Sequence, residues 1–178
     1  MKTKENIILI GMPGAGKSTI GVVLAKVLGY HFVDADIVIQ DQEKSLLHEI
    51  IEQEGVDGFI AVENRVNSQI NEERAVISTG GSVVYGREAM EHFSETGTII
   101  YLKLGYEALE KRLGDLHGRG VVLREGQDLK ALYEERVPLY EKYAHLTVEE
   151  DGLSVEETLQ NILKIYQRFC REKKENTI

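Results

Sequence analysis

Residues 11–18 read Gly-Met-Pro-Gly-Ala-Gly-Lys-Ser, which has the spacing G-x-x-x-x-G-K-S of a phosphate-binding loop. Glycines allow the backbone to come close to an anion, and successive backbone N–H groups then form a positively polarised nest. Lys17 would place a mobile charge on the outer phosphates, and Ser18 would offer its hydroxyl to Mg²⁺. The pattern therefore predicts binding of the phosphates of ATP or GTP.

The segments on either side of this loop are those that a phosphate-binding loop requires. Residues 6–10 form a short apolar run typical of a buried strand, and residues 17–28 repeat apolar side chains at helical spacing before Gly29. A helix that begins at Lys17 adds its dipole to the anion site. Strand, loop and helix agree, so a glycine-rich turn that matches by chance is the weaker interpretation. The residues expected to contact the nucleotide through this loop are Gly14, Ala15, Gly16, Lys17, Ser18 and Thr19.

Two carboxylates close the second predicted strand, at Asp34 and Asp36. Two positions apart in an extended chain, their side chains would point to the same side. One could help to hold Mg²⁺, and the other could accept a hydrogen bond from an attacking hydroxyl and orient it. Such a pair is often only a solvated turn, but beside a phosphate loop we favour a functional role.

The whole chain alternates short apolar runs with helical patterns. The candidate strands are residues 6–10, 31–34, 75–79, 98–104 and 145–149. This alternation predicts an α/β fold of three layers, in which helices cover both faces of a parallel sheet. The length of 178 residues suits one domain, which we expect to span residues 1–171, with a polar tail at 172–178 that frays.

Two insertions interrupt the alternation. Residues 37–74 show helical patterns with no strand between them, one from about Ser45 to Gly55 and another from Asp57 towards Asn71. An extra helical pair beside the phosphates is a natural place for a second substrate. Residues 114–126 place glycines around two arginines, which suggests a mobile lid over the phosphates, an ordinary solvated loop being the alternative.

Composition limits the partners. The formal net charge is −9, from 21 Lys and Arg against 30 Asp and Glu, which argues against a nucleic-acid scaffold or an anionic membrane surface. No apolar run approaches the ~18 residues of a membrane helix, and the single Cys170 excludes an intramolecular disulfide. We therefore expect a cytoplasmic monomer that acts on a small molecule, without a nucleic-acid or membrane partner.

Several further motifs narrow the class of protein. They are Phe32-Val33-Asp34-Ala35-Asp36, Phe59 with Glu63, Ser78-Thr79-Gly80-Gly81, and Arg136-Val137-Pro138-Leu139-Tyr140. Together with the phosphate loop, they make the chain from about residue 6 to 163 resemble shikimate kinases, which are P-loop kinases of the nucleoside-monophosphate-kinase type. The resemblance implies a sheet order of 2-3-1-4-5, a helical substrate-binding insertion and a lid. It also implies ATP and Mg²⁺ as cofactors, and phosphoryl transfer to shikimate to give shikimate 3-phosphate.

The resemblance implies roles for residues on the nucleotide side. Lys17 and Ser18 would hold phosphate and Mg²⁺, and Asp34 would lie in the outer shell of the metal. Arg112 would lie near the adenine. Arg119 would be the lid arginine that reaches the transferred phosphate, and with Lys17 it would act in catalysis.

It implies roles on the acceptor side as well. Asp36 would bind the substrate hydroxyls and act as the catalytic base, and Gly80 and Gly81 would contact the substrate through their backbone. Arg136 would bind the substrate carboxylate; Pro138 should kink or end the helix that carries it.

Three positions depart from the family pattern. Ile60 stands where the family has an arginine for the substrate carboxylate, Ser82 replaces a third glycine, and Gly120 replaces the proline after the lid arginine. A hydrogen bond to a charged group contributes about 1.5–3 kcal/mol, so the missing arginine could weaken acceptor binding markedly. The departures leave open a kinase of another polyol or hydroxy acid.

Other classes also remain to be considered. A non-catalytic ATP-binding regulator would keep the nucleotide site alone. A nucleoside-monophosphate kinase needs several arginines around its acceptor, and residues 37–74 hold only Arg65 and Arg74. A GTPase is disfavoured because no Asn-Lys-x-Asp motif occurs in the chain.

Overall fold

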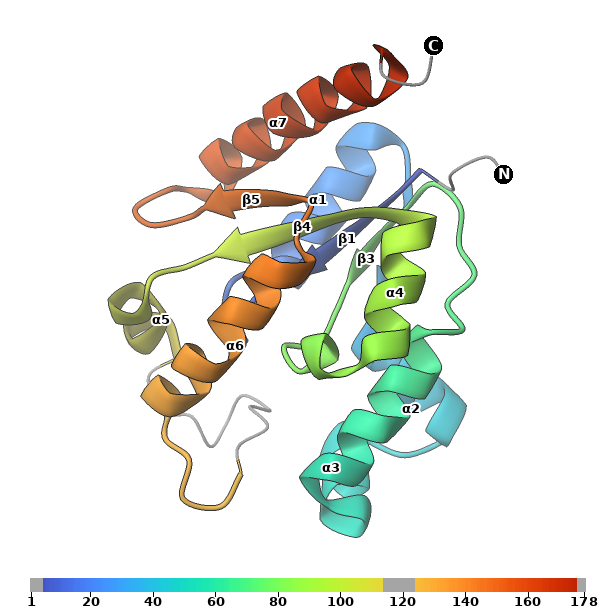
Figure 1. The fold of residues 1–178 in the computed structure, drawn as a ribbon, viewed down its shortest axis with the longest axis vertical. Helices are drawn as coiled ribbons and strands as arrows, with labels where there is room; N and C mark the ends of the chain where they lie inside the picture. Colours follow the sequence, from blue (N-terminus) through green and yellow to red (C-terminus); the bar gives the residue numbers. More distant parts are fainter. Residues whose placement is uncertain (1–4, 114–123, 176–178) are drawn as a thin grey trace.

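The computed structural model describes residues 5–113 and 124–175. Its five strands form one sheet in the order β2-β3-β1-β4-β5, and every neighbouring pair is parallel (Figure 1). Their bounds are β1 (Asn6–Ile10), β2 (His31–Asp34), β3 (Ala75–Ser78), β4 (Gly97–Lys103) and β5 (Leu146–Glu149). The predicted α/β class, the five parallel strands and their order are confirmed.

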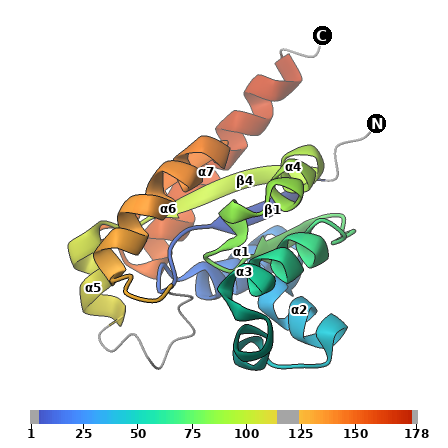
Figure 2. The same cartoon turned by 60° about the horizontal axis from the view of Figure 1, so that its bottom comes forward.

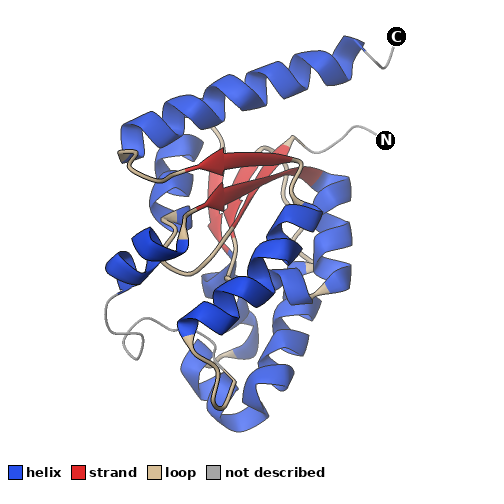
Figure 3. Ribbon diagram, turned by 60° about the vertical axis from the view of Figure 1, so that its left-hand side comes forward, coloured by secondary structure: helices blue, strands red, loops and turns tan. Residues whose placement is uncertain are grey.

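The core lies on both faces of the sheet. Side chains of β1 alternate between the two faces, so Ile8 and Ile10 belong to one hydrophobic cluster and Ile7 and Leu9 to the other. All four are fully buried. A parallel strand covered on both faces needs such a continuous apolar run. Figure 3 shows the sheet between helical layers.

Helices supply the outer layers. One face packs against α1 and α7, and the other packs against α4, α5 and α6 (Figure 1). The bounds are α1 (Lys17–Leu28), α4 (Arg87–Thr96), α5 (Tyr106–Leu113), α6 (Leu129–Tyr143) and α7 (Val155–Glu175), with a short 3₁₀ turn, η1 (Val83–Tyr85). Helix α1 begins and ends where the sequence predicts it.

The helical insertion consists of α2 (Ala35–Glu43) and α3 (Leu47–Asn67). Figure 2 shows the two helices packed beside each other at the end of the molecule that it brings forward. Helix α3 kinks at Gly55, whose φ of 71° and ψ of 178° are not helical, so the predicted break near this residue is confirmed. Helix α2, which begins directly after β2, was not predicted from the sequence.

Two predicted helix ends differ from the structure. Pro138 does not end α6, which continues to Tyr143. The proline removes its own N–H from the hydrogen-bond ladder and crowds the carbonyl group four residues earlier, but the burial of Arg136 and Tyr140 on either side of it favours a continuous helix. Helix α7 continues to Glu175, so residues 172–175 are helical, supported by the Arg168–Glu172 ion pair of 2.8 Å. Within the described ranges, no helix is long and apolar enough to cross a membrane.

Candidate active site

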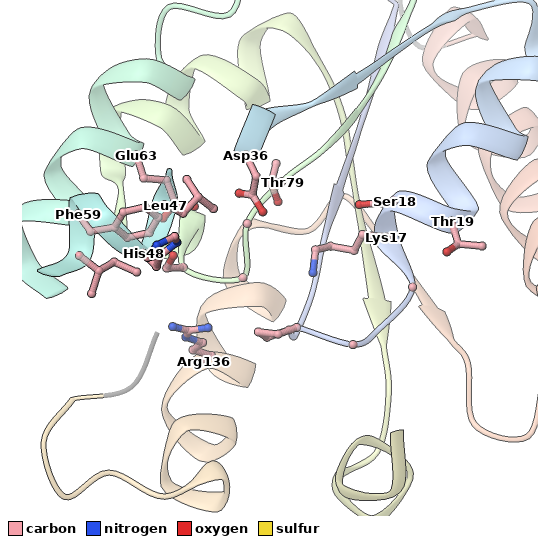
Figure 4. A pocket seen from close by; sticks show the side chains of 17 residues that line it. Lys17, Ser18, Thr19, Asp36, Leu47, His48, Phe59, Glu63, Thr79 and Arg136 are labelled. Carbon is pink, nitrogen blue, oxygen red and sulfur yellow. The ribbon is translucent and has the colours of Figure 1, made fainter. Parts of the chain in front are cut away.

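The predicted site residues meet at one edge of the sheet. Parallel strands end on the same side, so the loops that follow β1, β2 and β3 converge there, and such an edge is where α/β sheets bind ligands. A cavity of about 470 Å³ lies at this edge (Figure 4). Its 17 lining residues include Lys17, Asp36, Gly80, Gly81 and Arg136. The structure thus brings together the phosphate loop and the predicted acceptor groups.

The phosphate loop has a conformation that requires glycine. Gly14 and Gly16 both have a φ of 84°, in the left-handed region, and Gly16 is the N-cap of α1. A Cβ on Gly14 would also come within 2.9 Å of the Leu113 side chain. The backbone N–H groups before α1 are therefore held in the positively polarised arrangement that favours an anion.

Lys17 is held over this loop. Its Nζ donates hydrogen bonds to the carbonyl oxygens of Gly11 at 2.8 Å and Met12 at 2.9 Å, and the side chain is buried. Burial lowers the pKa of Lys17 from 10.5 to about 8, while the charges of Asp36, Glu150 and Glu63 oppose the shift. Phosphate oxygens bound at the loop would place negative charge beside this buried ammonium group and favour its protonated form.

Ser18 and Asp34 lie next to each other. The Ser18 hydroxyl donates to Asp34 Oδ2 at 3.1 Å and lies 3.1 Å from the Ser78 hydroxyl. Mg²⁺ in phosphate sites usually keeps several waters and takes only one or two protein oxygens besides the phosphates. The oxygens of Ser18 and Asp34, beside the loop, fit that requirement. Their role towards Mg²⁺ stays a prediction.

The prediction that Asp36 lies in an extended segment with Asp34 is wrong. Residue 36 lies in the first turn of α2, not on a strand, because Asp34 caps that helix: Asp34 Oδ1 accepts from the backbone N–H of Asp36 at 3.1 Å. The Asp36 side chain nevertheless lines the cavity. Burial raises the pKa of Asp36, the charge of Asp34 raises it further, and Lys17 opposes the rise.

The turn after β3 brings backbone to the cavity wall. A Cβ on Gly80 would collide with the Glu63 carboxylate and come within 3.1 Å of Asp36 Oδ1. A Cβ on Gly81 would come within 3.0 Å of Arg136 Nη1. Both glycines line the cavity. Only residues without a side chain let this backbone lie so close to the charged groups.

Arg136 is 1% exposed and comes from α6. Its guanidinium lies over the Tyr85 ring, 5.3 Å from the centroid, and its Nε donates to the Tyr85 hydroxyl at 3.4 Å. The same hydroxyl donates to the carboxylate of Glu135. Figure 4 shows Arg136 on the cavity wall below His48. A planar guanidinium held in one orientation suits a carboxylate ligand.

Glu63 is a second buried carboxyl group in this cavity. It is 1% exposed, and neither of its oxygens has a hydrogen-bond partner among the residues that the structure describes. Burial raises the pKa of Glu63 from 4.5 to about 7; the nearby Ser82 hydroxyl opposes the rise, and the charge of Asp36 adds to it. Glu63 belongs to a motif with Phe59, but no role was predicted for it from the sequence.

Some cavity residues were missed entirely. Leu47, His48 and Ile51, on the first two turns of α3, line the cavity. Figure 4 shows Leu47 and His48 close to Phe59. The i, i+4 spacing of Leu47 and Ile51 was the available signal, because such residues share one helix face. Ile60 is half-buried on the same helix, and Arg65 is turned towards Glu43 of α2, which it meets at 2.7 Å.

Arg112 lies in a second, smaller cavity of about 140 Å³, which also contains Ala15, Gly16 and Thr19. Gly16 and Thr19 line both cavities, so the two flank the start of α1. Arg119 and most of the predicted lid, residues 114–126, lie outside the described residues. Of the lid, Arg124 is described and meets Asp57 of α3 at 2.9 Å.

A parallel sheet of this order, with a phosphate loop after β1 and carboxylates beside it, defines a P-loop kinase. The family model described as shikimate kinase matches residues 13–167. The chain belongs to the shikimate kinase family. Residues 13–18 of the phosphate loop, the helical insertion and Arg136 all fall inside this match.

Relatives agree over nearly the whole chain. A shikimate kinase of Thermodesulfovibrio yellowstonii is 35% identical over 172 residues, which cover 95% of this chain and 99% of the relative. One of Clostridium botulinum is 36% identical, over 93% of this chain and 98% of its own length. The structure of Acinetobacter baumannii shikimate kinase in complex with shikimate superposes with a TM-score of 0.84 at 31% identity, covering 94% of this chain and 95% of that one.

The family membership fixes the enzyme class. The protein is an ATP-dependent kinase that phosphorylates a small molecule, as predicted. The open alternatives, a kinase of another polyol or hydroxy acid and a non-catalytic ATP-binding regulator, receive no support from these relatives.

Proposed function

We propose that this protein transfers the γ-phosphoryl group of ATP to the 3-hydroxyl of shikimate. The observation that carries the proposal is a single cavity lined by the phosphate loop, by Asp36 and by Arg136. A donor phosphate on the loop and an acceptor bound between Asp36 and Arg136 would share that space, so that transfer could proceed in line. The shikimate-bound relative supports this choice of acceptor.

Asp36 would hold the attacking hydroxyl. Its carboxylate lies within the cavity beside Gly80, and its raised pKa makes it a better proton acceptor than an ordinary aspartate. Lys17 would stabilise the charge that spreads over the transferred phosphoryl group, since it is already held above the loop. Mg²⁺, held through Ser18 and Asp34, would neutralise charge on the β- and γ-phosphates. We further propose that Arg119 adds a positive charge during transfer.

Arg136 and the two glycines would position the acceptor. The guanidinium would pair with the carboxylate of shikimate, and the backbone of Gly80 and Gly81 would contact its ring hydroxyls. On the nucleotide side, Gly14, Ala15, Gly16, Thr19 and Arg112 would contact ATP. A monomer in the cytoplasm stays our prediction.

The test is the rate of ADP release from Mg-ATP by the purified protein, with and without millimolar shikimate. We expect strong stimulation, and phosphorus NMR of the product should show one phosphate monoester on shikimate. Asp36→Asn should abolish the stimulation while leaving ATP binding intact. No stimulation by shikimate in a protein that binds ATP would refute the proposed acceptor.

A further inference from the structure

The second cavity holds an acidic residue that the proposed transfer does not use. Glu150 follows β5 directly and lines this cavity together with Arg112, Leu153 and Val155. It is 3% exposed, and its Oε2 has no hydrogen-bond partner within the described part of the chain. A buried carboxyl oxygen without a partner is costly, and most buried polar atoms have one. The arrangement calls for a donor that arrives with a ligand.

The backbone fixes Glu150 in place. Its N–H donates to the carbonyl oxygen of Lys103 at 2.8 Å, and its own carbonyl oxygen accepts from the N–H of Leu153 at 3.1 Å. These two bonds fix the backbone at residue 150, which carries the buried side chain at the cavity wall. Burial raises the pKa of Glu150 from 4.5 to about 7, and the charges of Arg112 and Lys17 oppose the rise. These two cations keep the ionised form accessible at neutral pH.

The position of the cavity indicates its ligand. Gly16 and Thr19 line both cavities, so a nucleotide with its phosphates on residues 11–18 could extend its nucleoside part into either of them. The larger cavity holds the groups proposed for the acceptor, which leaves the smaller one for the base. Its walls suit a flat heterocycle, because a guanidinium such as that of Arg112 stacks on aromatic rings and Leu153 and Val155 are apolar.

We propose that Glu150 recognises the base of the bound nucleotide by accepting a hydrogen bond from the 6-amino group of adenine. A base with an oxygen at this position would present an acceptor to the carboxylate and would be disfavoured. The inference rests on the proposed function only in that a nucleotide occupies the phosphate loop; it does not depend on shikimate.

Direct binding of diphosphates by titration calorimetry tests it, without an acceptor and at neutral pH. ADP carries the 6-amino group, IDP carries an oxygen there, and 2′-deoxy-ADP lacks a ribose hydroxyl. We expect the native protein to bind ADP about ten- to a hundredfold more tightly than IDP. Glu150→Ala should weaken the binding of ADP but not that of IDP, so that the ratio of the two dissociation constants falls close to one. Glu150→Gln should keep part of the preference, because the amide oxygen still accepts.

The matched control is Glu149→Ala, which removes the adjacent acid that faces Lys103 instead of the cavity. It should leave the ADP-to-IDP ratio unchanged. An unchanged ratio in both Glu150 variants would overturn the proposal, as would equal weakening of ADP and IDP. If the Glu150 variants lose only the preference for ADP over 2′-deoxy-ADP, Glu150 contacts the ribose, and the proposal is overturned. If Glu150→Ala does not fold, the isosteric Glu150→Gln decides the outcome. If the native protein binds none of the diphosphates, the result would contradict nucleotide binding by residues 11–18, on which the proposed function depends.

Discussion

The hydroxyl of Tyr140 donates a 2.6 Å hydrogen bond to the carbonyl oxygen of Gly81, which joins α6 to the turn after β3. Tyr140 lies four residues after Arg136, so both side chains share one helix face and are buried together. The Tyr140 ring also stacks on Tyr101 of β4, with the centroids 5.1 Å apart. One helix thus positions the arginine and the backbone that are proposed to hold the acceptor.

Tyr140→Phe should therefore affect the acceptor more than the nucleotide. The lost hydrogen bond is worth about 1 kcal/mol, which corresponds to an increase in KM for shikimate of about fivefold. The Kd for ATP should not change. Steady-state kinetics with each substrate varied in turn measures both.

Tyr133→Phe is the matched control for this variant. Tyr133 lies on the same helix and donates to the carbonyl oxygen of Leu104 at 3.1 Å, away from the larger cavity. It should lower the free energy of unfolding by a similar amount without changing KM for shikimate. If the two variants change KM for shikimate equally, the Tyr140 hydroxyl contributes to stability but has no specific role in acceptor binding.

Lys17 should take up a proton when nucleotide binds. Its pKa in the free protein is about 8, lowered by burial, and phosphate oxygens favour the charged form, so binding raises that pKa. Between pH 8 and 9 we expect proton uptake with ADP, and an affinity that falls as the pH rises through this range. Calorimetry in two buffers with different ionisation enthalpies measures the uptake. Lys17→Arg should show none, because arginine stays charged; the same uptake there would assign the proton to another group.

Local sequence signals predicted much of the framework. The strands, the phosphate loop and α1 depend on patterns within about twenty residues, and each agrees with the structure. The prediction for Asp36 was wrong because it required the extended segment to continue through residue 36, whereas β2 ends at Asp34 and α2 begins at Ala35. A capping aspartate followed by an apolar-periodic run, as in Asp34 before Ile37 and Val38, is itself a helix-start signal that would have predicted α2.

Long-range contacts explain what the sequence could not supply. Glu63 and Glu150 look like solvated acids in their own helix and loop, and only packing against distant segments buries them. The stacking of Arg136 on Tyr85 joins residues 51 positions apart. Hydrophobic periodicity predicts which face of an element is buried, but not which polar group another element will cover.

Glu63 should make stability depend on pH between about 4.5 and 7. Its pKa is about 7 in the folded protein against an ordinary 4.5, so in this range the folded state binds more protons than the unfolded state. The free energy of unfolding should therefore fall as the pH rises through this window, by at most about 1.4 kcal/mol per pH unit from this group. Glu150 contributes in the same direction.

Glu63→Gln removes the titrating group and should flatten that slope. Urea unfolding at several pH values measures it, and some slope should remain because Asp36 and Glu150 are unchanged. Glu52→Gln, at an exposed position on the same helix, should keep the native slope. A native slope in Glu63→Gln would mean that the carboxyl group does not titrate in this window.

Ile60→Arg tests whether the departure at position 60 limits acceptor binding. Residue 60 is half-buried, one position after Phe59 and three before Glu63, so an arginine there could extend its head along the cavity wall and pair with the Glu63 carboxylate. If the proposed shikimate carboxylate lies within reach, a further charged hydrogen bond should raise kcat/KM by about one to two orders of magnitude. The gain should come through KM, because the carboxylate is bound equally in the ground and transition states.

The new ion pair between Arg at position 60 and Glu63 should also lower the pKa of Glu63 and flatten the pH slope of stability. Ile60→Met, which changes shape but not charge, should do neither. If the slope flattens in Ile60→Arg without any gain in kcat/KM, the arginine reaches Glu63 but not the substrate, and Arg136 would remain the proposed partner of the acceptor carboxylate.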